Sequence, residues 1–344
     1  MAGKLSFCSQ EENNKQQQGT RRKLDNDLLQ KYVNPMTEPN AEGLKMRCPS
    51  CGFALGNVST SASDGQHSIA CPKCAFEMVC DGDGWNACVD KDHPKEFSRQ
   101  WLLWESGKLG DPNLVYGMHP EEEFSRLMEH LKLTPDRLKS MRILEVGFGH
   151  GTLLRELQKW SPAAYGLDLV KPLLSAGLRP GSTIFGSLFQ IPVMPGQFDL
   201  VICRGVIHHT DRPEEAFACL SEQVAEGGIC YLTLYEPGIK GSLLLRNVLP
   251  WSWRYPESVR LAIASVLGLF RATLECMRAR KIGLKSFARY HGNAKLGIFD
   301  VISPRWTSLH PIAEVTGWFA GRGYSVQRLG PGHYAGLKHS SRKT

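Results

Sequence analysis

The chain has 344 residues, with 41 Lys or Arg against 34 Asp or Glu, which gives a formal net charge of +7. Hydrophobic residues make up 42% and charged residues 22%. This composition is that of a globular protein long enough for two or three domains, and it excludes collagen-like, fibrous or wholly disordered chains.

The first 44 residues are polar and rich in Gln and Asn. They predict a mobile tail over 1–44, with a short helix at 24–32. They contain no apolar stretch typical of a secretory signal, and the best apolar run of the chain, 261–270, is far shorter than the ~20 residues of a membrane-spanning helix. We therefore expect a cytoplasmic protein, in which the eleven cysteines indicate metal ligands or buried thiols rather than disulfides.

Two Cys-x2-Cys pairs follow the tail. Cys48 and Cys51 form the first, and Cys71 and Cys74 form the second after 19 intervening residues. Tetrahedral Zn²⁺ takes four thiolates, and each such turn presents two of them. The spacing predicts a zinc ribbon over 45–90 with a structural Zn²⁺, the alternative being a set of buried thiols. Cys80 and Cys88 are then either spare ligands or small buried hydrophobes.

The rest of the chain predicts helices and then an alternation of strands and helices. A helical connector is expected over 91–139, because apolar residues recur there at helical spacing. Strands are expected at 142–146, 163–170, 182–185, 198–203 and 228–234, with helices at 152–160 and 213–224. A helix at 311–321 and strands at 324–329 and 333–337 end the pattern. This alternation predicts an α/β fold: a Rossmann-like, doubly wound, mostly parallel seven-stranded sheet over 140–344, with a small N-terminal zinc ribbon and a helical insert at 238–300.

A glycine-rich turn lies between the first strand and its helix. Gly147, Gly149 and Gly151 alternate with other residues after Glu145, and Asp168 ends the next strand. Glycines let the backbone approach a ligand closely, and a carboxylate ~20 residues further on can reach ribose hydroxyls. The alternative for Asp168 is a helix N-cap.

These residues resemble a known family. Segment 144–151 resembles the first motif of class I S-adenosylmethionine-dependent methyltransferases, and Gly166-Leu167-Asp168 resembles their ribose-binding second motif. Segments 186–192, 198–201, 206–209 and 225–228 are similar to the later motifs in order, most of all to the broad subgroup that includes ubiquinone and menaquinone methyltransferases. The likeness is good over 140–237 and loose over 301–330. The cysteine segment resembles zinc ribbons fused to, or activating, tRNA and rRNA methyltransferases.

The resemblance implies a set of cofactor-binding positions. Many members carry an Asp that accepts the adenine amino group where this chain has Ser187, whose hydroxyl is a weaker acceptor. The resemblance implies that Asp168 holds the ribose hydroxyls, that Ser187 and the Leu188 backbone meet the adenine, and that Arg204 lies near the sulfonium. The methionine and ribose region would be lined by Glu145, Gly147, Gly149 and Gly151.

Methyl transfer from a sulfonium is an in-line displacement, which needs an aligned acceptor and, for a protonated acceptor, a base. His208 and His209 follow the fourth strand, at the sheet edge where ligands bind. We expect His209 to be structural and His208 to be a candidate base. Tyr290 and His291 are further candidates in a segment that could cover the pocket, the alternative being loop residues without a catalytic role.

The insert is the basic part of the chain. Residues 238–300 hold eleven Lys or Arg against three acids, a balance of +8, and apolar residues are dense along a helix expected over 258–281. Four readings stay open: a lid with Trp251, Trp253 and Tyr255 as pocket walls, a peripheral membrane contact, an RNA-binding surface, or a solvated helix with a dimer face.

The sequence thus predicts an S-adenosylmethionine-dependent methyltransferase, with S-adenosyl-L-methionine as methyl donor, acting on a small or lipid-like acceptor under a helical lid. The alternative is a tRNA or rRNA methyltransferase guided by the zinc ribbon and the basic insert. A third reading is an inactive methyltransferase fold serving as a zinc-ribbon binding module.

Overall fold

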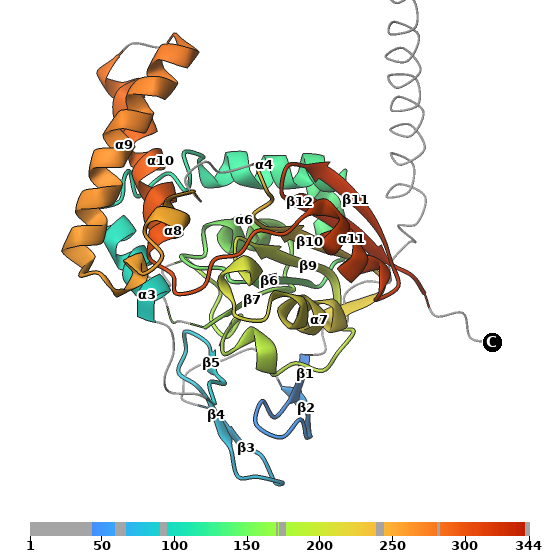
Figure 1. Cartoon of the computed structure of the whole chain (residues 1–344). Coiled ribbons are helices and arrows are strands. Elements are labelled where there is room, and N and C mark those ends of the chain that lie inside the picture. Colours follow the sequence, from blue (N-terminus) through green and yellow to red (C-terminus); the bar gives the residue numbers. More distant parts are fainter. Residues whose placement is uncertain are drawn as a thin grey trace, which may run out of the picture.

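A single ten-stranded sheet forms the centre of the molecule (Figure 1). The computed structural model describes residues 43–58, 67–89, 95–169, 171, 177–238, 244–280 and 283–340, so nearly all of the predicted tail lies outside the described residues. The strands are, in spatial order, β11 (Tyr324–Gly330), β12 (His333–Lys338), β10 (Val224–Thr233), β9 (Phe198–Arg204), β6 (Ile143–Val146), β7 (Ala164–Asp168), β8 (Thr183–Phe185), β5 (Trp85–Asn86), β4 (Glu77–Cys80) and β3 (His67–Ala70).

The predicted α/β fold class is confirmed. Strands β10, β9, β6, β7 and β8 run parallel, and the hairpin of β11 and β12 adds antiparallel to β10. These are the seven strands that the sequence predicts. The remaining three come from the cysteine-rich segment, so the sheet is longer than predicted.

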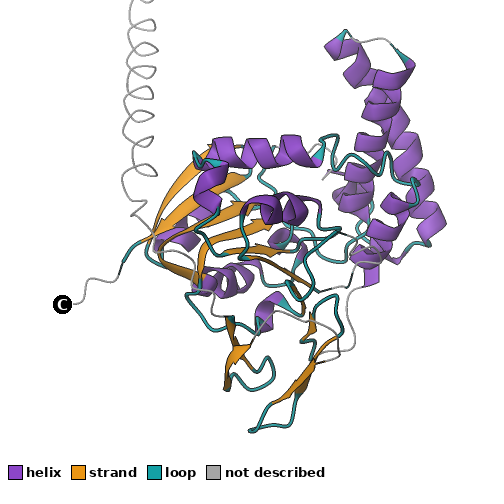
Figure 2. Ribbon diagram, turned by 180° about the vertical axis from the view of Figure 1, so that it is seen from behind, coloured by secondary structure: helices purple, strands orange, loops and turns teal. Residues whose placement is uncertain are grey.

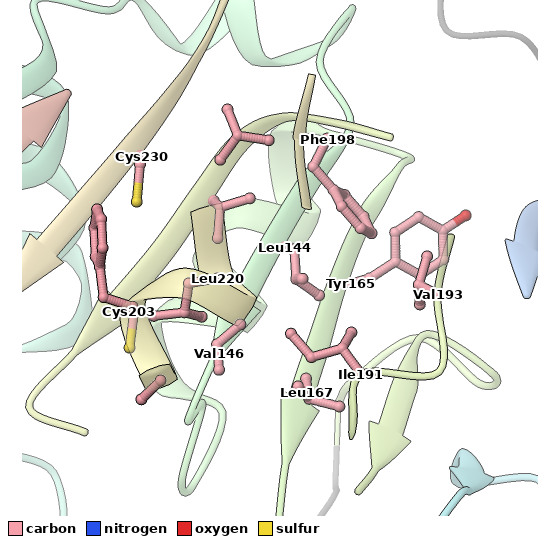
Figure 3. Packing of buried hydrophobic residues seen from close by; sticks show 14 of the residues in the cluster. Leu144, Val146, Tyr165, Leu167, Ile191, Val193, Phe198, Cys203, Leu220 and Cys230 are labelled. Atoms are coloured by element: carbon pink, nitrogen blue, oxygen red, sulfur yellow. The ribbon is translucent and has the colours of Figure 1, made fainter. Parts of the chain in front are cut away.

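Helices cover both faces of the sheet (Figure 2). Successive side chains of a strand point to opposite faces. Accordingly, Leu144 and Val146 belong to the core beneath α7 (Pro213–Gln223) and α11 (Ile312–Ala320), part of which Figure 3 shows, whereas Ile143 belongs to the other face. That other face packs against α4 (Pro120–Leu131), α5 (Pro135–Leu138) and α6 (Thr152–Trp160).

The cysteine-rich segment is joined to the sheet. Trp85 and Asn86 of β5 pair in parallel with Ile184 and Phe185 of β8. The first hairpin, β1 (Leu44–Arg47) and β2 (Ala54–Val58), is tied to a loop of the α/β part, where the Arg47 amide donates to the Pro192 carbonyl at 3.0 Å. The segment therefore shares the main hydrophobic core, to which it contributes Leu44, Met46, Met78, Cys80, Trp85 and Ala87.

The insert forms a helical hairpin that projects from the body (Figures 1 and 2). It comprises the short α8 (Leu244–Val248), a turn of 3₁₀ helix at Ser252–Arg254, and the two long helices α9 (Glu257–Ala279) and α10 (Leu284–Ile302). Gly268 lets the long helices approach closely, because a Cβ there would lie only 3.3 Å from the Lys295 backbone nitrogen. The expected helix over 258–281 is present as α9, but Tyr290 and His291 lie within α10 and not in a loop.

The base of the hairpin packs on α3 (Lys95–Glu105) in a third apolar cluster, which contains Leu103, Trp104, Ala264 and Leu296. A guanidinium nitrogen of Arg99 also lies 3.1 Å from the Glu257 carboxylate at the start of α9. Among the described residues, no helix is long and apolar enough to cross a membrane.

Candidate functional site

The glycine-rich turn lies between β6 and α6, at the carboxyl edge of the parallel strands. Gly147, Gly149 and Gly151 have φ angles of +73°, +56° and +75°, a region that L-residues rarely adopt. Side chains are excluded as well: a Cβ on Gly147 would lie 2.1 Å from a methyl of Val206, and one on Gly149 would lie 2.7 Å from the Trp101 ring. The turn therefore requires glycine at these positions, where its backbone packs closely against Val206 and Trp101.

Asp168, at the end of β7, lies directly beside this turn. Its Oδ2 accepts a hydrogen bond from the Gly149 amide at 2.8 Å, and its carbonyl accepts one from the Gly186 amide at 2.8 Å. The ends of β6, β7 and β8 are thereby held together. The alternative that Asp168 caps a following helix concerns residues that lie mostly outside the described ranges.

Ser187 and Leu188 come next along this edge. Ser187 precedes a turn of 3₁₀ helix, Leu188–Gln190, and its Oγ accepts from the Phe189 amide at 3.2 Å. The hydroxyl is thus oriented by its own backbone while both residues remain partly exposed. The Ser187 hydroxyl is thus a hydrogen-bonding group at this edge of the sheet.

Arg204, at the end of β9, lies between two carboxylates. Its Nη2 is 3.0 Å from Oε1 of the buried Glu145, and its Nη1 pairs with Glu123 of α4. Burial raises the pKa of Glu145 to about 7, although Arg204 acts in the opposite direction. The second oxygen of Glu145, Oε2, is buried without a hydrogen-bond partner among the described residues. Glu123 was missed by the sequence reasoning, because it lies on a separate helix 81 residues away.

Helix α3 covers the glycine turn. Trp101 contacts Gly149, the rings of Trp104 and His150 have centroids 4.9 Å apart, and Glu105 lies 2.8 Å from His150 Nε2. Burial, helped by Arg155, lowers the pKa of His150 to about 4, so this histidine is neutral near pH 7. The helix that was expected only to connect two domains thus forms a wall of the site.

A second polar cluster surrounds Asp300 of α10, which is only 5% exposed. Its carboxylate accepts from Gln100 Nε2 at 3.1 Å and from the hydroxyls of Tyr235 and Tyr116. Burial and the Asp300 charge raise the pKa of both phenols well above the usual value, so they stay protonated and act as donors. We call this set, together with His209, the Asp300 cluster.

Of the two histidines after β9, His209 belongs to the Asp300 cluster and His208 adjoins it. Nε2 of His209 lies 3.8 Å from Asp300, while its Nδ1 lies 3.2 Å from the Trp306 carbonyl. His208 is fully buried, and its ring stacks on Tyr235 with centroids 3.8 Å apart. We call Arg204, Glu123 and Glu145 the Arg204 group. The charges of Glu123 and Arg204 also act on the pKa of Tyr116, so this group lies close to the Asp300 cluster.

No sequence pattern pointed to Asp300, Tyr235, Tyr116 or Gln100. Gln100 and Asp300 are 200 residues apart, and Tyr235 and Asp300 are 65 apart. The position of Tyr235 just after β10 could have indicated its place in the site, because the carboxyl ends of parallel strands meet at one edge of the sheet.

Tyr290 and His291 are not brought to this edge. His291 lies between the long helices, with Nε2 3.3 Å from the Ser265 carbonyl. It is nine residues from Asp300 along α10, which is about 14 Å of helix. Of the expected pocket walls, Trp251 is 66% exposed and Trp253 stacks against Arg254 and Arg305.

The four predicted zinc ligands do converge. Their Sγ atoms all lie within 4.8 Å of one another, with 3.5 Å between Cys48 and Cys74 and 3.6 Å between Cys51 and Cys71. Four thiolates at ~2.3 Å from one tetrahedral ion would have similar separations. Each turn is closed by a residue with positive φ, Gly52 at +74° and Ala75 at +58°. Cys80 is instead buried in the main core.

Comparison with known proteins agrees with this geometry. Residues 120–265 match the family described as "Methyltransferase domain". A "Ubiquinone biosynthesis O-methyltransferase" of Colwellia psychrerythraea is 27% identical over 174 residues, 45% of this chain and 68% of that protein. An uncharacterized protein of Synechococcus is 39% identical over 49 residues, so the chain spans only 12% of that relative.

Solved structures of methyltransferases are also similar at low identity. A "possible histamine N-methyltransferase" from Thermotoga maritima is 15% identical with a TM-score of 0.36, over 71% of this chain and 98% of that one. The magnesium protoporphyrin IX methyltransferase of Synechocystis is 12% identical with a TM-score of 0.34, over 71% and 94%.

Proposed function

We propose that this chain, whose residues 120–265 form a class I S-adenosylmethionine-dependent methyltransferase domain, transfers the methyl group of S-adenosylmethionine to a small or lipid-like acceptor. The observation that carries the proposal is the glycine turn at the carboxyl edge of the sheet, which is hydrogen-bonded to Asp168 and follows the buried Glu145. The bound donor would supply a methyl group made electrophilic by its sulfonium.

The residues present fit this donor. Asp168 would hold the ribose hydroxyls, and Ser187 and the Leu188 backbone would meet the adenine. The unpartnered Oε2 of Glu145 suits the ammonium of the methionine part. Arg204 supports this role indirectly, because it donates to the other oxygen of the Glu145 carboxylate. Gly147, Gly149 and Gly151 adopt positive φ angles that shape the turn against which the donor would lie.

We assign the acceptor to the side of the Asp300 cluster, next to the Arg204 group. Among the three candidate bases, His208 adjoins this cluster, so we propose that it receives a proton when the acceptor carries one. Tyr290 and His291, placed well along α10, are better suited to holding the hairpin together.

We propose that Cys48, Cys51, Cys71 and Cys74 bind one structural Zn²⁺. The segment they stabilise extends the central sheet through β5, so the metal would support the fold and not the reaction. Metal analysis should find about one zinc per chain. Retention of that zinc in a Cys48→Ser/Cys71→Ser protein would refute the assignment.

The donor site is tested by calorimetric titration with S-adenosylmethionine. Asp168→Asn should weaken binding by roughly 10- to 100-fold, since it removes charge-assisted hydrogen bonds from a shape that stays the same. Glu222→Ala, an exposed acid elsewhere on the surface, is the matched control and should leave binding unchanged. Equal binding of S-adenosylmethionine by both variants would contradict the assignment of the donor site to Asp168. Labelled donor with cell extract, with and without ribonuclease, then separates the lipid-like acceptor from the RNA alternative.

A further inference from the structure

Helix α9 carries an exposed apolar stripe that the proposed reaction does not use. Its members recur at intervals of three, four and seven residues, which places them on one face of the helix. The first and last members are 18 residues apart in sequence, or about 27 Å along the helix. The outward stripe comprises Val259, Val266, Leu269, Phe270 and Met277, exposed by 41%, 65%, 47%, 68% and 58%.

The hairpin does not need this stripe for its own packing. A different row, Ala264, Gly268, Ala272 and Cys276, is buried at every fourth residue of α9. Gly268 in this row touches Lys295 of α10. Helix α9 therefore has two apolar faces, one packed within the hairpin and one exposed along an element that projects from the body (Figures 1 and 2).

Basic side chains accompany the outward stripe. Arg271 and Arg278, seven residues apart, lie along one flank, and Arg280 follows at the end of the helix; all three are exposed. The one acid in this half of α9 is Glu275, whose carboxylate lies 3.6 Å from Arg278. The surface thus combines uncovered apolar side chains with an excess of positive charge.

We propose that the outward stripe of α9 docks on an anionic membrane surface. A helix with one apolar face and basic flanks inserts that face at the headgroup boundary, and its cations attract anionic lipids. A second copy of the chain is a poorer occupant, because it would bring further arginines to a surface with no spare acid. An RNA would leave Phe270 and Met277 without a role. The docking goes beyond the proposed methyl transfer. It also bears on that reaction, since the same hairpin carries Asp300 at its base and would bring the acceptor side close to lipid.

The test is co-sedimentation of the full-length protein with phosphatidylcholine vesicles made with and without phosphatidylserine. Binding should require phosphatidylserine and weaken with added salt. Val266→Ser/Phe270→Ser and Arg271→Glu/Arg278→Glu should each weaken it by about tenfold or more. Matched controls at other exposed positions, Leu309→Ser/Ile312→Ser and Arg126→Glu/Lys139→Glu, should bind as the unchanged protein does.

Circular dichroism and S-adenosylmethionine titration of every variant separate the outcomes. Preserved donor binding with lost vesicle binding supports the docking, whereas failure of the unchanged protein to bind S-adenosylmethionine counts against the proposed function alone. Equal vesicle binding by stripe variants and controls, or no binding by the unchanged protein, overturns the docking. Stripe-dependent dimerisation in sedimentation, without vesicle binding, overturns it in favour of a second copy.

Discussion

Two buried polar groups lie side by side at the carboxyl edge of the sheet, and they balance charge in opposite ways. In the Arg204 group, two carboxylates share one guanidinium. In the Asp300 cluster, one carboxylate is surrounded by neutral donors, with the His209 ring 3.8 Å away. The Arg204 group depends on an ion pair whose loss strongly lowers the unfolding free energy. The Asp300 cluster depends on hydrogen bonds to uncharged groups. The end proposed for the charged donor is thus held by charge, and the end proposed for the acceptor is held without a permanent cation.

Removal of the guanidinium should have the largest effect. Arg204→Met leaves Glu123 and Glu145 facing one another without a cation, and breaking a buried pair in this way costs about 3–5 kcal/mol of unfolding free energy. Urea denaturation measures it. Arg204→Lys, which keeps the charge, should lose less. A loss below about 1 kcal/mol in the Met variant would show that the group is not held by the ion pair.

Substitution of Asp300 should lower the unfolding free energy by less, and it should affect methyl transfer and not donor binding. Asp300→Ala leaves Gln100 and two phenols without their acceptor, at about 2 kcal/mol of unfolding free energy. Methyl transfer should fall, while affinity for S-adenosylmethionine should stay unchanged, because Asp300 lies on the side proposed for the acceptor. A donor affinity that falls as far as it does in Asp168→Asn would contradict the division between the two ends.

The smallest effect is a pH dependence of donor binding. The pKa of Glu145 is raised to about 7, so lowering the pH from 7 to 6 protonates most of the carboxylate. If only its ionised form receives the ammonium, affinity should fall by about fivefold over this interval and level off at higher pH. Calorimetry at several pH values checks this. Glu145→Gln should bind weakly with a flat profile, and a steep profile in that variant would assign the titration to another group.

The parts of the site that the sequence could predict are those held within one short segment. Gly149 and its neighbours could be predicted because a positive φ favours glycine, whatever surrounds the turn. The role of the cysteine pairs could be predicted from the sequence because one Cys-x2-Cys turn presents two thiolates to the same ion. Asp168 was found through its position at the end of a strand, where the topology brings it to the turn.

The parts that could not be predicted are assembled from distant segments. Glu123 meets Arg204 across 81 residues, and Gln100 meets Asp300 across 200. From the sequence, a Glu on an amphipathic helix is expected to lie at the surface, and an Asp inside the basic insert is expected to be solvated. Only the packing of α4 and of the hairpin base makes either one part of a buried group.

By itself, the amino-acid sequence determined the α/β alternation, the glycine turn and the convergence of four cysteines, because these depend on local backbone geometry and on the period of apolar residues. Only the tertiary structure decided that the cysteine-rich segment extends the central sheet, that the insert is a projecting hairpin with an exposed second face, and that α10 brings a carboxylate to Gln100 and Tyr235. These features depend on which faces meet in space, and apolar periodicity shows that a face is buried without showing what it is buried against.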